Sequence, residues 1–160
     1  MKNLFSLCLL FISILCWCTS KIPSSDSENE YSIFIDFSHR GMEPKMEYLF
    51  DSFGSLPGDS IGKNCCIDIA VRYSDMCNLK ALPLNIEVIS QTDSISNYKI
   101  DFPLFNTYDT KAGKGNFGIY EKKLPLFSKP ISSQVLQIAI STNEKNTKGI
   151  LSLGIICKKI

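Results

Sequence analysis

The chain is a series of short segments in which apolar and polar residues alternate. In residues 65–74, CCIDIAVRYS, every second residue falls on the same side of an extended chain. One side carries Cys65, Ile67, Ile69, Val71 and Tyr73, and the other carries Cys66, Asp68, Ala70 and Arg72. A period of two is typical of a β-strand and not of a helix. The same alternation recurs at 31–37, 82–90, 97–105, 132–142 and 149–160.

Turn-forming clusters separate these segments, such as SLPGDSIGKN at 55–64 and STNEKNTKG at 141–149. Residues 43–53, EPKMEYLFDSF, are the one helical candidate, and it is short. Short, regularly spaced strands that are separated by turn-forming residues are typical of an antiparallel β-sandwich. The sequence therefore predicts an all-β, immunoglobulin- or jelly-roll-like sandwich of about seven to eight strands within residues 31–160.

The N-terminal segment predicts export. Lys2 precedes a continuous apolar run at 4–18 that ends in polar residues, which is the pattern of a signal peptide over residues 1–20. Residues 21–30, KIPSSDSENE, are small, polar and acidic and indicate a flexible tether. Two alternatives stay open: a lipid anchor on Cys16 or Cys18, or a plain cut after Ser20. The expected location is the cell envelope, either membrane-anchored or periplasmic.

The charge balance disfavours polyanionic partners. The chain has 17 Lys and Arg against 16 Asp and Glu, and removal of Lys2 with the signal leaves 16 against 16. A mature charge near zero provides no basic field, so we expect no nucleic-acid partner.

Four cysteines remain after the signal: Cys65, Cys66, Cys77 and Cys157. We expect free thiols that are buried as small apolar side chains. The alternative is a disulfide, because the set is even and the protein is expected to be exported, and the preferred pairing would join Cys65 or Cys66 to Cys77.

The stretch GKGNFG at 113–118 has the G-x-G-x-x-G spacing of a dinucleotide-binding loop. Such a loop needs a helix after it and an acidic residue about 20 positions later. The following residues contain Pro125 and Pro130, and no acid occurs between Glu121 and Glu144. We therefore expect no nucleotide. The glycines instead predict a tight bend or bulge with positive φ between two strands, with Lys114 and Asn116 facing solvent.

No catalytic or metal constellation is evident from the residues. His39 is the single histidine and lies in a polar loop. A cysteine pair followed eleven residues later by Cys77 lacks zinc-site spacing. The acids Asp68, Glu87, Asp101 and Glu121 fit the solvated face of a sheet better than a catalytic pair. We expect a protein that is not an enzyme and has no cofactor, metal or catalytic residue.

Several landmarks together resemble the GldH-type gliding-motility lipoprotein family over residues 60–160. They are the strand ending DIAVRYSD with Arg72, the following Asn78 and Leu79, the 113–118 glycine bend, and the closing strand with Gly149, Ile150, Leu153 and Gly154. The resemblance implies a small, non-enzymatic envelope lipoprotein. Its implied partners are envelope proteins of the gliding or associated secretion machinery. The alternative function is a periplasmic or surface ligand-binding or carbohydrate-binding sandwich, which an exposed aromatic row would indicate.

Overall fold

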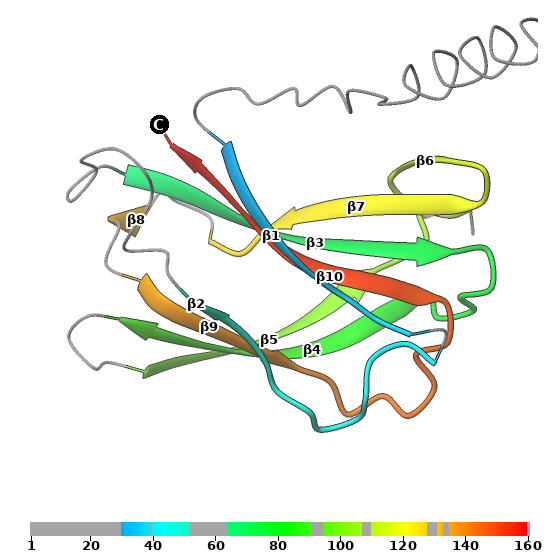
Figure 1. The fold of residues 1–160 in the computed structure, drawn as a ribbon, viewed down its shortest axis with the longest axis horizontal. Coiled ribbons are helices and arrows are strands. Elements are labelled where there is room, and N and C mark those ends of the chain that lie inside the picture. Colours follow the sequence, from blue (N-terminus) through cyan, green and yellow to red (C-terminus); the bar gives the residue numbers. More distant parts are fainter. Residues whose placement is uncertain are drawn as a thin grey trace, which may run out of the picture.

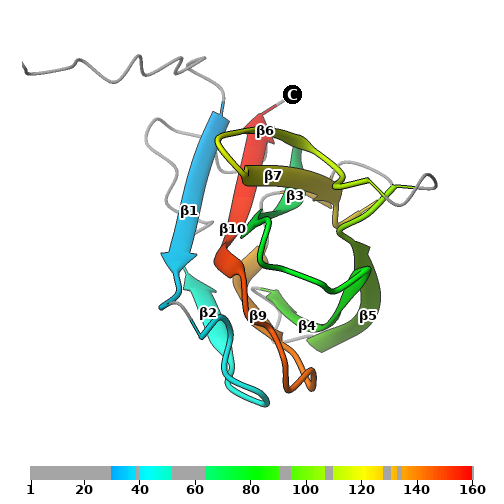
Figure 2. The same cartoon turned by 90° about the vertical axis from the view of Figure 1, so that its right-hand side faces the viewer.

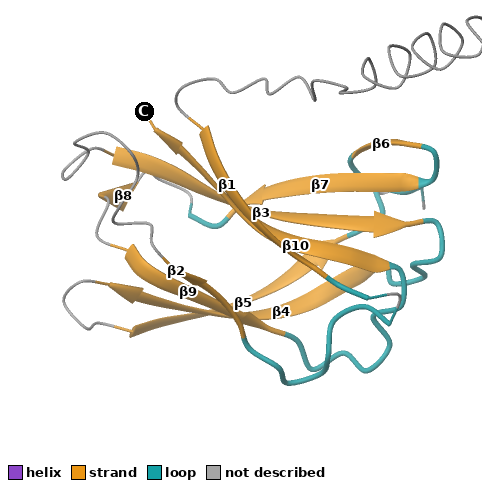
Figure 3. Cartoon of the chain, in the orientation of Figure 1, coloured by secondary structure: helices purple, strands orange, loops and turns teal. Residues whose placement is uncertain are grey.

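The computed structural model describes residues 30–38, 40–51, 64–90, 95–106, 110–127, 131–132 and 135–159. These residues form ten β-strands and contain no helix, so the all-β prediction is confirmed (Figures 1 and 3). The strands are β1 (Glu30–Asp36), β2 (Tyr48–Asp51), β3 (Asn64–Ser74), β4 (Ala81–Ser90), β5 (Ile95–Pro103), β6 (Lys114–Asn116), β7 (Ile119–Pro125), β8 (Ile131–Ser132), β9 (Val135–Ser141) and β10 (Ile150–Lys159).

The strands make two antiparallel sheets that face each other, as expected for a sandwich (Figure 2). One sheet has the order β1-β10-β3-β7-β6, with β8 also paired to β3, and the other has the order β2-β9-β4-β5. The described residues form ten strands where seven to eight were predicted. The additional strands are β2, β6 and β8, which are only two to four residues long. Such short strands give too little alternation to be read from sequence.

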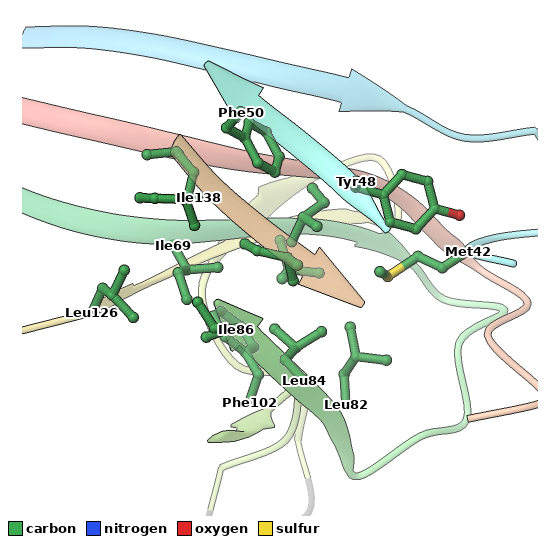
Figure 4. Close-up of a cluster of buried hydrophobic side chains, with 14 of the residues drawn as sticks. Met42, Tyr48, Phe50, Ile69, Leu82, Leu84, Ile86, Phe102, Leu126 and Ile138 are labelled. Carbon is green, nitrogen blue, oxygen red and sulfur yellow. The ribbon is translucent and has the colours of Figure 1, made fainter. Parts of the chain in front are cut away.

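The core lies between the two sheets and is made by the predicted alternating positions (Figure 4). β3 contributes Ile67, Ile69, Val71 and Tyr73, and β4 contributes Leu82, Leu84, Ile86 and Val88. Phe50, Phe102 and Ile138 add large side chains that are fully buried. Burial of apolar area at about 25 cal/mol per Å² makes this layer the main source of stability.

β10 is a central strand, paired to β1 and β3, and it has buried residues on both of its faces. Alternation places Leu151, Leu153, Ile155 and Cys157 on one face, and the last three are buried. Leu151 is half-buried, at a register shift between Ile150 and Ser152. Ile156, on the opposite face, is buried as well. Gly154 also lies on that outer face, where the ring of Phe34 covers it closely.

One local prediction is wrong. The helical candidate at 43–53 contains β2, in which Tyr48 and Phe50 are buried while Leu49 and Asp51 are exposed. The helical pattern at 43–53 is short, and hydrogen bonding of β2 to β9 makes this segment an edge strand instead. The alternation over 97–105 also puts Tyr98 on the same side as Phe102, yet Tyr98 is 37% exposed because β5 is an edge strand.

Candidate binding surface

The glycine-rich stretch forms the hairpin between β6 and β7, which confirms the predicted tight bend. Asn116 pairs with Ile119, so only Phe117 and Gly118 form the turn. Both turn residues have positive φ, 55° and 75°. This is the geometry of a type I′ turn, which matches the twist of the flanking strands and favours Asn and Gly. Lys114 and Asn116 are exposed, as predicted.

Phe117 is the unexpected residue of this turn. Its side chain is 102% exposed, the highest value among the large apolar residues described. A bulky non-glycine residue at positive φ is unusual and costs roughly 1–3 kcal/mol. Phe117 therefore combines an unfavourable backbone conformation with an apolar ring that packs on nothing in the chain's own core.

The hairpin is held to the β3–β4 turn by Asp75. The Asp75 backbone N–H donates a hydrogen bond to the Gly118 carbonyl oxygen at 2.9 Å. The Asp75 carboxylate accepts a hydrogen bond from the Tyr120 hydroxyl, and this bond raises the pKa of Tyr120. These contacts fix the turn at its base and leave its tip in solvent.

Tyr120 connects the hairpin to the core. Its ring stacks on the ring of Tyr73 with centroids 5.6 Å apart. Tyr73 is fully buried, and its hydroxyl donates to the Leu104 carbonyl oxygen at 2.7 Å and to that of Ala112. Burial raises the pKa of Tyr73 to about 12. The exposed tip is thus presented by a rigid base.

Two further exposed apolar residues adjoin the pair Asp75 and Gly118, whose backbones are hydrogen-bonded. Met76 follows Asp75 in the β3–β4 turn and is 60% exposed, and Ile119 follows Gly118 and is 48% exposed. We call Met76, Phe117 and Ile119 the hairpin patch. Exposed Phe and Met on a fixed scaffold are typical of protein interfaces, where aromatic residues and Met are enriched.

The hairpin patch lies at the end of the sandwich opposite the start of β1. Glu30 pairs with Lys158, and Lys158 pairs with Cys66, at one end of the larger sheet. Tyr73 pairs with Tyr120 at the other end. In Figure 1 the C-terminus and the start of β1 share one end of the molecule, and the turn between β6 and β7 lies at the far end.

The outer face of the larger sheet is covered by ion pairs. Arg72 bonds Glu121 at 2.7 Å, and its guanidinium lies 3.9 Å from the centroid of the Phe34 ring. Lys158 bonds Asp68 at 2.6 Å, which raises the pKa of Lys158. Two of the acids weighed as catalytic candidates are therefore partners of basic residues on a sheet face.

The remaining predicted site residues are not brought together. His39, Cys16, Cys18 and the predicted cleavage position after Ser20 lie outside the described residues. Cys65, Cys66, Cys77 and Cys157 are free thiols. Cys65 lies near the start of β3 and Cys77 lies beyond its end at Ser74, roughly 30 Å away at 3.3 Å per residue. The expected free thiols are therefore confirmed, and the alternative bridge to Cys77 is wrong.

Within the residues described, no group of three His, Cys, Asp or Glu side chains could hold a metal ion. The same part of the chain has no helix that is long and apolar enough to cross a membrane. Exposed aromatic residues occur there at Tyr31, Tyr98 and Phe117, on three separate elements, and do not form a row.

Comparisons with known proteins give no family. No family model matches the chain, and no curated protein matches it. Two solved structures show a weak likeness. One is the VP2 subviral particle of infectious bursal disease virus, with 14% identity, a TM-score of 0.31, and coverage of 82% of this chain and 33% of that one. The other is the Gx strain of the same virus, with 14% identity, a TM-score of 0.24, and coverage of 83% and 32%. The chain thus spans about a third of the proteins it matches.

Proposed function

We propose that this protein is a non-enzymatic accessory component of the cell envelope that binds a protein partner through the hairpin patch. The family resemblance of residues 60–160 supports a partner from gliding motility or the associated secretion machinery. In this proposal the signal at 1–20 exports the chain, and Cys16 or Cys18 can carry a lipid anchor. A cut after Ser20 would leave the same domain free in the periplasm.

The conformation and exposure of Phe117 carry the proposal. A turn selected for folding alone would favour Asn or Gly at this position, because both accept positive φ at little cost. Strained residues of this kind are often associated with function. An exposed aromatic ring is removed from water when a partner covers it. Aromatic residues buried in this way contribute much of the binding free energy of protein interfaces.

The hairpin patch and the start of β1, where the tether would end, lie at opposite ends of the domain, which supports a partner located away from the tether. A tether before Glu30 would attach the sandwich to a membrane at one end, while Phe117 lies at the other end. The patch would then face away from the lipid anchor. This arrangement favours a protein partner over insertion into the membrane that holds the tether.

The charges beside the patch indicate the chemistry of the partner. Lys114 is exposed on β6, and Lys148 shares a shallow depression with Met76. A partner with an apolar pocket and an acidic rim would complement this surface, since opposite charges at the rim steer association.

Site-specific photo-crosslinking tests the proposal. A photoreactive phenylalanine analogue is placed at position 117 or, as a matched control, at exposed Tyr31 near the opposite end. The proposal predicts one discrete adduct with an envelope protein from position 117 in the natural host, and not from position 31. Absence of an adduct at 117, or the same adducts from both positions, would contradict it.

A further inference from the structure

A hollow of about 600 Å³ lies on the outer face of the four-stranded sheet, away from the hairpin patch. Two rows of side chains cross it, and strand register defines both rows. Lys99 of β5, Asn85 of β4 and Ser141 of β9 form the first row. Asn97, Glu87 and Ala139 form the second row on the same three strands. Directly opposed side chains within a row stand about 5 Å apart, and the two rows are two residues, about 7 Å, apart along each strand, so one small ligand could contact both rows.

The rows offer a mixture of hydrogen-bonding groups. The amides of Asn85 and Asn97 and the hydroxyl of Ser141 can donate and accept, while Glu87 accepts and Lys99 donates. This capacity matches the hydroxyl group, which also donates and accepts. Glu47 also lines the hollow, so its charged groups are two carboxylates and the one ammonium of Lys99, a balance that disfavours an anionic ligand.

The second row also has an apolar end. Because the side chain of Ala139 is small, it leaves space beside Glu87, and this space is part of the hollow. Leu49 of β2 pairs with Ala139 and is 49% exposed. A polar strip beside a small apolar floor suits a ligand that has hydroxyls on its edge and C–H groups on its face. A sugar ring has this character.

The place of the hollow in the sheet argues against an extended peptide. Peptides that add to a sheet bind at an edge strand, where main-chain groups are free. β4 is paired to β5 and β9, and β9 is paired to β2 and β4 (Figure 1). The middle of the hollow lies on these two interior strands, and the edge strand β5 adds the side chains of Asn97 and Lys99, so a ligand on this face is recognised by side chains.

We propose that this hollow binds a neutral oligosaccharide, with hydroxyls bonded to Asn85, Glu87 and Asn97 and a ring face on Ala139. A volume of about 600 Å³ is within the usual range for small-ligand sites of roughly 300–1,000 Å³. This site does not depend on the protein-binding function of the hairpin patch.

Calorimetric titration of the full exported chain with soluble cello-, xylo-, manno- and chito-oligosaccharides tests the site. Binding of at least one probe is expected, with a loss of tenfold or more in Glu87→Ala. Ala139→Phe should abolish binding, because the ring fills the hollow. Asp101→Ala is the matched control, since Asp101 is exposed on β5 outside the hollow. Circular dichroism verifies that each variant is folded.

Two results would overturn the site: no binding of any probe at millimolar concentration, or binding that survives Ala139→Phe in a folded protein. Phe117→Asn should bind the sugar like the parent chain. That comparison separates failure of this site from failure of the hairpin patch.

Discussion

The carboxylate of Asp75 lies where a side chain on Gly118 would begin. A Cβ added to Gly118 would stand 2.5 Å from Asp75 Oδ2. Gly118 also has a φ of 75°, which disfavours any residue with a Cβ. Two separate constraints therefore require glycine at this turn. Both serve to place the adjacent Phe117 at the tip of the hairpin.

Gly118→Ala should destabilise the protein by about 1–3 kcal/mol, from positive φ and from displacement of Asp75 away from Tyr120. Chemical denaturation measures the loss. Asn116→Ala, an exposed change in the same hairpin, is the control and should have a much smaller effect. If displacement of Asp75 contributes, Gly118→Ala should cost less in an Asp75→Ala background than in the parent chain. Equal stability of Gly118→Ala and the parent would refute the proposed constraint.

Stability should decline at alkaline pH because of Cys157. Burial raises the pKa of Cys157 from 9.0 to about 12. Between these values the unfolded chain has lost the thiol proton while the folded chain retains it. The unfolding free energy therefore falls as pH rises from about 9 and levels off above about 12.

Guanidinium denaturation midpoints between pH 8 and pH 11 measure this decline. Tyr73, with its pKa raised to about 12, adds to the decline above pH 10. Cys157→Ala should be less stable throughout, because it leaves a cavity, but should show a shallower slope. An unchanged slope in Cys157→Ala would show that the thiol is not the titrating group.

The thiols should differ in reactivity. Cys66 is half-buried, whereas Cys65, Cys77 and Cys157 are buried, and burial raises the pKa of each of these three. Since the thiolate is the reactive form, a brief maleimide pulse at pH 7 should label Cys66 first. Peptide mass spectrometry identifies the labelled residue. Labelling of Cys77 as fast as Cys66 in the folded protein would be inconsistent with this packing.

Alternation of residue types predicts the long strands because each has one face in the core. β3 and β4 follow this rule best, since their opposite faces carry polar residues such as Asp68, Arg72 and Glu87, although Ala70 on that face of β3 is buried. β10 departs from it because a central strand covered by Phe34 can be apolar on both sides. The strand order, in which β10 joins β1 to β3, depends on contacts between distant segments and is not encoded locally.

The site was only partly predictable. The glycine spacing predicted the bend, because positive φ leaves a clear signature in composition. The exposure of Phe117 was missed, since an aromatic residue between strands is usually a core residue. The pairing of Asn116 with Ile119 makes Phe117 and Gly118 a two-residue turn and puts Phe117 at positive φ. That pairing is known only from the structure, so the sequence alone did not indicate the exposed ring.

The most direct test of the central claim is Phe117→Asn, studied for stability and for partner binding in the same preparation. Asn suits the type I′ turn, so the free energy of unfolding should rise by about 0.5–1 kcal/mol. Affinity for the partner identified by crosslinking should fall at least tenfold, because the exposed anchor is removed. A stable variant that no longer binds is the predicted result. A variant that loses stability, or that binds the partner unchanged, would contradict the account.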